Sequence, residues 1–187
     1  DKSNNNELYL IFPSANFSIK ITRIKDNQLI KTLEGHTGKI TFLKHFYNDI
    51  EQKDYLITSG KKSVVKVWDL SDNYKLLYSL DINYSVNTNI YSCTLFFSEN
   101  KGNYLIVSSN ENKDEDYTKI YDFYTQDLIA NLDKTDLVEI YYLLLWNDNS
   151  KDYLIESSLG RILIHNLENK ELFIILSTNK KSVQNSM

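Results

Sequence analysis

Cysteine is nearly absent from the chain, since Cys93 is the only one among 187 residues. A single cysteine excludes an internal disulfide framework and leaves no cysteine cluster for zinc. The three histidines, His36, His45 and His165, lie in different parts of the sequence, without cysteine or carboxylate neighbours at metal-ligand spacing. We therefore expect no metal site. The lack of disulfides is typical of a reducing compartment and predicts an intracellular protein of the cytoplasm or nucleus.

Glycine is also scarce, with five in the whole chain. None of them falls in the glycine-rich frames that cradle phosphate groups. The segments 59–60 and 158–160 do not form the nucleophile elbow of a hydrolase. The carboxylates stand mostly in polar loops, where a solvated surface is their common role. The sequence thus predicts no enzyme and no cofactor.

A basic excess is missing as well, because the formal net charge is -4. Binding to a phosphate backbone normally needs a broad positive footprint, so nucleic acid is disfavoured as a partner. No apolar run approaches the roughly 18 residues that span a bilayer, and the longest lies around 143–146. We therefore expect no membrane segment. The chain starts at Asp1 and not at methionine, so a targeting segment upstream would lie outside this sequence.

What the sequence does contain is an internal repeat. The triplet Tyr-Leu-Ile begins at residues 9, 55, 104 and 153, so successive copies are 46, 49 and 49 residues apart. The last three copies extend to YLITS, YLIVSS and YLIESS. Self-similarity at a period of roughly 20–50 residues indicates a protein built from repeated structural units.

Each copy belongs to a set of short apolar or β-branched runs bounded by Asn, Asp, Gly and Ser, which is the pattern of β-strands. A second run follows each triplet, at 18–24, 63–70, 118–123 and 161–167. A third run follows at 28–33, 75–80, 127–132 and 171–176. Another run precedes copies two to four, at 40–46, 89–97 and 138–146. Three units therefore have four predicted strands each, and the first unit lacks its opening strand.

The predicted strands read as nearly continuous apolar runs, which is typical of sheets that are buried on both faces. One four-stranded unit cannot bury both of its faces alone, so neighbouring units must stack. The segment 137–146 is the most ambiguous, because Asp136 and Glu139 could form a helix-capping pair. Its place in the repeat favours a strand.

The second unit resembles a WD repeat. It reads LEGH at 33–36, TSG at 58–60 and WD at 68–69. A Gly-His to Trp-Asp frame with a period near 40–45 residues is characteristic of that family. In the other units the Trp-Asp position holds Thr22-Arg23, Tyr121-Asp122 and His165-Asn166. The sharp motif thus covers one unit, while the order and spacing of the strands extend the resemblance over nearly the whole chain.

The resemblance implies a structural hydrogen-bonded network in the second unit. WD repeats join a His before the first strand, a Ser or Thr on the second, an Asp in the next turn and the Trp of the third. The matching residues here are His36, Thr58 and Trp68, with Asp69 completing the Trp-Asp pair. Lys62 holds the position of the turn Asp, so we expect the network to be incomplete. A buried imidazole and a buried indole N–H each need a partner, which favours a structural role for His36 over a catalytic one.

The resemblance also implies an all-β fold, a β-propeller of four-stranded antiparallel blades with about three complete blades and part of a fourth. We place the partial blade at 1–34, the blades at 35–80, 81–132 and 133–176, and a tail or the start of another blade at 177–187. Either the ends close a four-bladed ring, or the chain is a portion of a larger propeller. The polar segment 182–185 makes a poor innermost strand and favours the portion, whose open ends would promote self-association.

Partners of such propellers commonly bind at the central channel and at one side of the blades. That side carries the turns between second and third strands and the loops that enter the first strands. The candidate contact residues are Thr37, Lys39, Lys61, Lys62, Tyr84, Glu115, Asp116 and Arg161. The acidic segment 110–117 could capture a basic peptide or a cation, although a solvated loop tip is the simpler interpretation.

The resulting hypothesis is a non-catalytic scaffold that binds other proteins or peptides. The alternatives are a structural subunit of a large ribonucleoprotein or cytoskeletal assembly, and a reader of RNA or modified peptides. A positive stripe on the contact side would favour RNA, and a shallow aromatic pocket at the channel mouth would favour peptide. A fold does not fix a function, so these hypotheses rest on the family resemblance and on the lack of catalytic motifs.

Overall fold

The computed structural model describes residues 7–61, 63–82, 90–109, 118–132, 140–158, 160–177 and 184–185. Over these residues the chain forms β-strands β1 to β16 and no helix. Every pair of neighbouring strands is antiparallel. The expectation of an all-β fold is therefore confirmed for the described part of the chain.

The strands form a series of separate sheets, each built from strands that follow one another in the sequence. The first sheet consists of β1 (Tyr9–Pro13), β2 (Ile19–Arg23) and β3 (Gln28–Leu33). The second consists of β4 (Ile40–Asn48), β5 (Lys53–Gly60), β6 (Val64–Asp69) and β7 (Lys75–Asp81). The third consists of β8 (Ile90–Ser98), β9 (Gly102–Ser109), β10 (Thr118–Asp122) and β11 (Leu128–Leu132). The fourth consists of β12 (Ile140–Asn147), β13 (Asp152–Ser158), β14 (Arg161–Asn166), β15 (Glu171–Ser177) and the short β16 (Gln184–Asn185).

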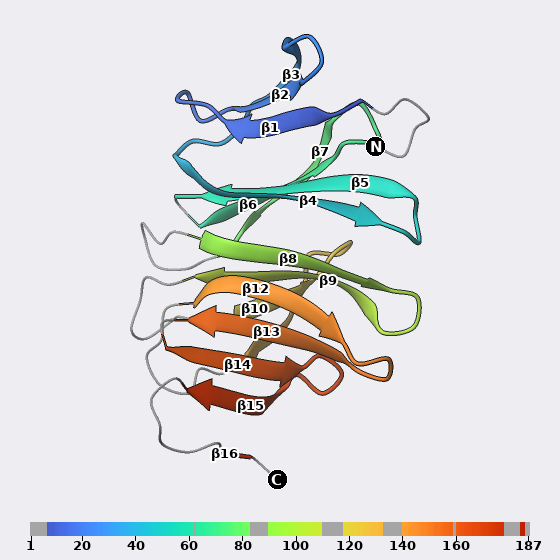
Figure 1. The fold of residues 1–187 in the computed structure, drawn as a ribbon, viewed down its shortest axis with the longest axis vertical. Coiled ribbons are helices and arrows are strands. Elements are labelled where there is room, and N and C mark those ends of the chain that lie inside the picture. Colours follow the sequence, from blue (N-terminus) through green and yellow to red (C-terminus); the bar gives the residue numbers. More distant parts are fainter. Residues whose placement is uncertain are drawn as a thin grey trace.

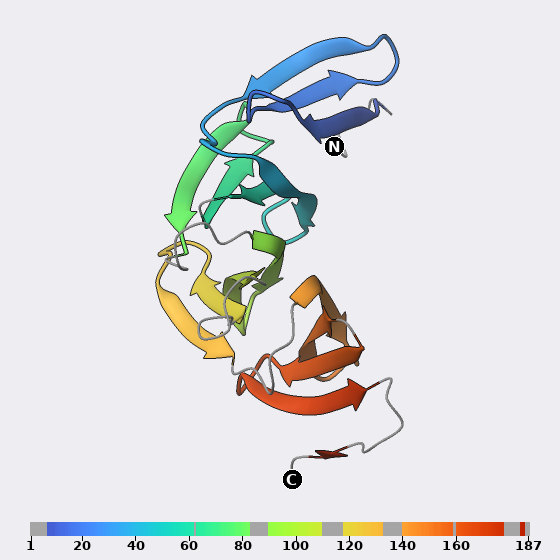
Figure 2. The ribbon, with the colours of Figure 1, turned by 90° about the vertical axis from the view of Figure 1, so that its left-hand side faces the viewer.

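The sheets are stacked in chain order. Figure 1 shows them one above another, from the first sheet at the top to the fourth at the bottom. The side view in Figure 2 shows that they follow an open arc. Strands β4, β8 and β12 lie on its concave side, and β7 and β11 lie on its convex side. The arc therefore brings the opening strands of successive sheets together.

The hydrophobic core is divided among the spaces between neighbouring sheets. Leu56 and Trp68 pack against Ile19 and Ile21 of the first sheet. The next residue along β5, Ile57, belongs to the cluster shared with the third sheet. A third cluster joins the third and fourth sheets. Because adjacent residues of β5 point to opposite faces and are both fully buried, the second sheet is covered on both sides.

The sheets share irregularities that give the repeat a structural meaning. The pairs β2–β3, β6–β7, β10–β11 and β14–β15 each have a register shift at the same place, between Ile21/Thr22, Val67/Trp68, Ile120/Tyr121 and Ile164/His165. In each pair the later strand carries the extra residue, which is Ile30, Leu77, Ile129 or Phe173. The turn between the two strands of each of these pairs contains a residue with positive φ, at Asn27, Asn73, Gln126 and Lys170. A bulge bends the strand that carries the extra residue, so β3, β7, β11 and β15 share one irregularity at the same place.

The predicted strands agree closely with those of the structure. The ambiguous segment 137–146 contains β12, and a strand is therefore present where a helix was the alternative. The tail segment 182–185 contributes β16, which pairs with the outer strand β15. None of the described elements is a helix with the length and apolar character needed to cross a membrane.

Candidate functional site

The structure brings together His36, Thr58 and Trp68. The indole nitrogen of Trp68 lies 3.0 Å from Thr58 Oγ1, and His36 Nε2 lies 2.8 Å from the same oxygen. Thr58 lies on β5, Trp68 lies on β6, and His36 lies in the loop before β4. This loop is therefore anchored to the two middle strands of its sheet. Lys62, which holds the position of the turn Asp, lies outside the described residues.

The direction of these hydrogen bonds fixes the protonation state that suits the network. An indole N–H can only donate, so Thr58 Oγ1 accepts from Trp68 and can donate its own proton to His36. An imidazole nitrogen accepts only when it is unprotonated. Burial, followed by the positive charge of Lys66, lowers the pKa of His36 to about 4. A neutral imidazole at neutral pH is consistent with a structural role.

Asp69 closes the turn after the third strand. Its Oδ1 accepts hydrogen bonds from the backbone N–H groups of Ser71 at 2.8 Å and Asp72 at 3.1 Å. Asp122 accepts in the same way from the two corresponding N–H groups of the third sheet. Asn166 accepts from one in the fourth sheet. The Asp or Asn at this position therefore serves the backbone of a turn.

In the fourth sheet, a buried Glu156 and His165 stand where the second sheet has Thr58 and Trp68. Thr58, Val107 and Glu156 hold equivalent positions, because each is the residue directly after a Tyr-Leu-Ile triplet. Glu156 Oε2 lies 3.2 Å from His165 Nε2, and the side chains are 3% and 1% exposed. Among the described residues, the other oxygen of Glu156 has no hydrogen-bond partner. The sequence reasoning missed this pair.

A signal for the pair was nevertheless present. Glu156 replaces Thr58 in the extended triplet YLIESS, and His165 replaces Trp68 in the terminal dipeptide. In the second sheet the corresponding side chains are hydrogen-bonded. Two polar substitutions at both ends of one contact predict a second hydrogen-bonded pair, because a buried charge needs a partner.

Three predicted contact residues lie close together beside the second sheet. The loop that carries Thr37 and Lys39 is tied to the turn after β5, because Lys61 N donates to Lys39 O at 3.0 Å. All three side chains are exposed. Gly60 permits this close approach, since a Cβ there would lie 2.1 Å from the Lys39 oxygen. The second sheet therefore presents a compact pair of loops with two lysines.

The other predicted contact residues are not part of this group. Arg161 begins β14 on the same side of the molecule, but in the fourth sheet, and its side chain is half-buried. Tyr84, Glu115 and Asp116 lie outside the described residues.

The opposite side of the sheets carries polar links between neighbouring units. Glu51, in the turn after β4, accepts hydrogen bonds from Tyr55 of its own sheet and Tyr124 of the third sheet. Burial and the bond to Glu51 raise the pKa of Tyr124 to about 12. Because the phenol remains protonated, it donates to the carboxylate over the ordinary pH range.

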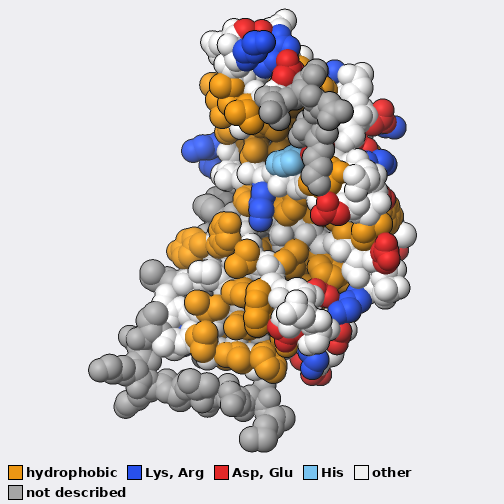
Figure 3. Space-filling model, turned by 45° about the vertical axis from the view of Figure 1, so that its right-hand side comes forward, with side chains coloured by type: hydrophobic (Ala, Val, Ile, Leu, Met, Phe, Trp, Pro, Cys, Tyr) orange, Lys and Arg blue, Asp and Glu red, His pale blue; other side chains and the backbone are white. Residues whose placement is uncertain are grey.

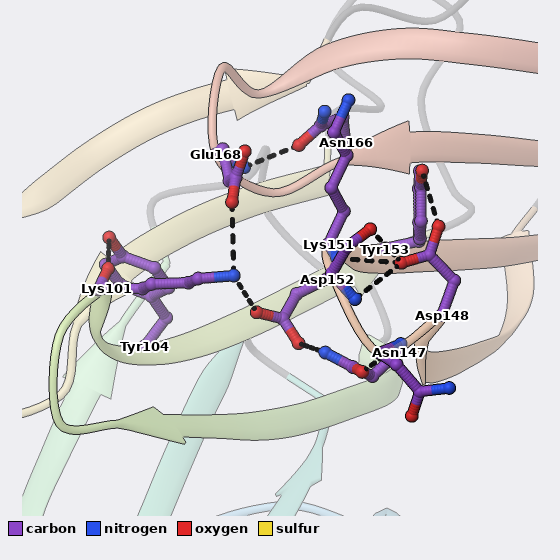
Figure 4. A network of polar contacts seen from close by, with 11 residues as sticks. Lys101, Tyr104, Asn147, Asp148, Lys151, Asp152, Tyr153, Asn166 and Glu168 are labelled. Atoms are coloured by element: carbon purple, nitrogen blue, oxygen red, sulfur yellow. Dashed lines mark hydrogen bonds and ion pairs between the residues drawn. The ribbon is translucent and has the colours of Figure 1, made fainter.

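A second link joins the third and fourth sheets (Figure 4). Lys101, in the turn after β8, lies 2.9 Å from Asp152 and 3.1 Å from Glu168. Its hydrogen bonds to these two carboxylates raise the pKa of Lys101. Asp152 also accepts from Asn147 at 2.6 Å, so residues at two turns of the fourth sheet, β12–β13 and β14–β15, hold the lysine. Lys101, Asp152 and Glu168 therefore connect the third and fourth sheets through contacts with one another.

The described residues contain no group of three or more His, Cys, Asp or Glu side chains placed to hold a metal ion. No model of a known protein family matches the sequence, and a search of curated proteins finds no match.

Proposed function

We propose that the chain is a portion of a WD-type β-propeller and that it works inside the cell as a non-catalytic scaffold for other proteins. The main support is the stack of antiparallel sheets with a bulge at the same place in β3, β7, β11 and β15. The second sheet adds a bonded His36, Thr58 and Trp68 in a Gly-His to Trp-Asp frame. Stacked rigid units of this kind offer extended surfaces for partners.

The use of the ionisable side chains also favours a scaffold over an enzyme. His36 closes a loop, His165 pairs with Glu156 inside the protein, and Lys101 joins two sheets. Each of these groups is occupied by a partner within the fold. An acid or base that works on a substrate must instead reach the proton that it transfers.

The contact surface of this proposal is the pair of loops with Thr37, Lys39 and Lys61. Two exposed lysines on a backbone tied by one hydrogen bond form a positive projection of fixed shape. Such a projection suits an acidic segment of a partner, with charge serving specificity and the rate of association.

Charge reversal tests this surface. The intact protein is purified under native conditions beside the double variant Lys39→Glu/Lys61→Glu and the control Lys75→Glu, which changes an exposed lysine on the opposite side. We expect a stoichiometric partner to stay with the wild type and the control and to be lost from the double variant. Equal retention by all three proteins would refute this contact surface.

A second candidate function, a subunit of a larger assembly, is favoured by the open face of the fourth sheet. Tyr142, Leu144 and Trp146 of β12 are about half exposed, as is Phe173 of β15. Figure 3 shows hydrophobic side chains gathered over this lower part of the molecule. The corresponding Phe42 and Phe46 of β4 pack against the core shared with the next sheet. Light scattering tests this candidate: association is expected, and the mass of one chain without aggregation would count against it.

A further inference from the structure

The outer strand of every sheet carries two adjacent apolar residues at the same place. The first is always a leucine, at positions 29, 76, 128 and 172, and it pairs with the position that holds Trp68 in the second sheet. The second is the extra residue of the register shift, which is Ile30, Leu77, Ile129 or Phe173. The residue across from the leucine changes among Thr, Trp, Tyr and His, so the apolar pair is kept where its neighbour is not.

The apolar pairs of β7 and β11 lie at the surface. Leu76 and Leu77 are 37% and 38% exposed, and Leu128 and Ile129 are 50% and 44% exposed. Figure 2 shows both strands on the convex side of the arc. Scattered apolar residues are ordinary on a protein surface, but a gathered group of them indicates a place where another molecule binds.

Aromatic rings join the apolar pairs of the second and third sheets. Tyr78, the neighbour of Leu77, packs on Phe123 with ring centroids 5.9 Å apart, and Phe123 packs on Tyr124 at 5.1 Å. Tyr124 is 52% exposed and donates a hydrogen bond to Glu51 of the second sheet. We call the exposed side chains of this region the outer patch, which consists of Leu76, Leu77, Tyr124, Leu128 and Ile129. The outer patch belongs to the two middle sheets, so it does not depend on what adjoins the first or the fourth sheet.

The border of the outer patch is acidic at the third sheet. Asp127 directly precedes Leu128, and Asp122 stands at the start of the same turn. Both carboxylates accept hydrogen bonds from uncharged groups of that turn. Among the described residues 118–132 the cation is Lys119, which donates to a backbone oxygen of residue 82. A partner that covers the outer patch therefore needs positive side chains beside its apolar ones.

An amphipathic helix suits the spacing of this surface. Stacked sheets lie about 10 Å apart, and seven residues of an α-helix rise about 10.5 Å. Apolar side chains seven positions apart on one helix can therefore reach the pairs of β7 and β11. A second copy of this chain is a poorer occupant, because its outer patch has the same acidic border and the same convex shape.

We propose that the outer patch binds an amphipathic helix of a partner protein, with its apolar stripe on the leucine pairs and its lysines or arginines toward Asp122 and Asp127. This is recognition of a helix through anchors on one of its faces. The outer patch lies at the start of β7, whereas Lys39 and Lys61 lie at the start of β4 and the end of β5. The helix site thus adds a second surface to the proposed scaffold and is tested separately.

The test uses the whole chain and a fluorescein-labelled helical peptide with the sequence LKKLLKKLLKKLLK. Its matched control, LEELLEELLEELLE, keeps the apolar stripe and reverses every charge. Binding is followed by fluorescence anisotropy at low salt. We expect the lysine peptide to saturate in the micromolar range and the glutamate peptide to bind more weakly by about tenfold or more.

Three protein variants identify the surface that the peptide occupies. The double variant Leu77→Ser/Ile129→Ser removes apolar anchors and should weaken binding of the lysine peptide by about tenfold or more. Asp127→Lys reverses a border charge and should weaken it by about threefold or more. The control Leu144→Ser changes a side chain of similar exposure, 48%, on the concave side and should leave binding unchanged. If the double variant does not fold, Asp127→Lys and the two peptides still decide the question.

The proposal is overturned if the lysine peptide does not bind, if both peptides bind equally, or if Leu144→Ser weakens binding as much as the double variant does. It is also overturned if the purified protein is a dimer that the double variant dissociates, because a second copy then covers the outer patch. None of these results bears on the variants of Lys39 and Lys61, so failure here is distinguishable from failure of the proposed contact surface.

Discussion

Removal of one partner from the buried pair of the fourth sheet should destabilise the protein strongly. In His165→Ala, Glu156 keeps its place in the interior but loses the imidazole, and its other oxygen already has no partner among the described residues. Leaving a buried charge unpaired costs about 3–5 kcal/mol. We expect a loss of that size in the free energy of unfolding at pH 7, measured by urea denaturation with far-ultraviolet circular dichroism.

The exposed pair of His45 and Asp54 supplies the matched control. Its nitrogen-to-oxygen distance of 2.7 Å is shorter than the 3.2 Å of the buried pair, but the imidazole is 46% exposed. Water can solvate the carboxylate after His45→Ala, so the expected loss is below about 1 kcal/mol. Burial, and not the distance between the atoms, should thus decide the magnitude.

A replacement of both partners distinguishes the effect of the polar contact from the effect of the volume that the two side chains fill. The double variant Glu156→Thr/His165→Trp installs the side chains that are hydrogen-bonded in the second sheet. An uncharged pair avoids the cost of burying charge, so this variant should be more stable than His165→Ala by about 2 kcal/mol or more. Equal losses for His165→Ala and His45→Ala, or no rescue by the double variant, would refute the reasoning.

Four smaller predictions concern the second sheet and its neighbours. Thr58→Val removes the acceptor for Trp68 and should cost about 1–3 kcal/mol in urea denaturation. Gly60→Ala forces a methyl group against the Lys39 oxygen and should cost about 1–3 kcal/mol, seen as a lower melting temperature. The folded pKa of His36 is about 4, below its ordinary 6.5, so the unfolded state binds the proton first. Stability should fall by about 1–3 kcal/mol between pH 6.5 and 4, after allowance for solvent screening, and His36→Gln should remove this slope in denaturation series across pH. Lys101→Ala breaks a partly exposed link and should cost only about 1 kcal/mol or less by the same denaturation assay.

Much of the fold was predictable because burial on two faces leaves a strong pattern. The Tyr-Leu-Ile copies in β5 and β9 lie in strands where both directions from the backbone meet apolar neighbours. The network of His36, Thr58 and Trp68 was accessible through the family resemblance, since a spacing alone does not say which side chains meet.

Other features depend on backbone geometry that residue types do not encode. The register shift before Trp68 recurs before Thr22, Tyr121 and His165, although these residues share no chemistry. The positive φ positions in the turns before β3, β7, β11 and β15 are held by Asn, Gln or Lys, so no glycine in the sequence indicates them.

The register shift also explains how the repeat can persist while its motif disappears. At the residue after the shift, the side chain meets one from the preceding strand, as Trp68 meets Thr58 and His165 meets Glu156. The fold then requires only that the two fill the space and that any buried polar atom finds a partner. Trp with Thr meets this requirement through one hydrogen bond, and His with Glu meets it in part, through the contact of Nε2 with one carboxylate oxygen. A chain can therefore keep the register shift in all four sheets while the Trp-Asp dipeptide stands in one of them.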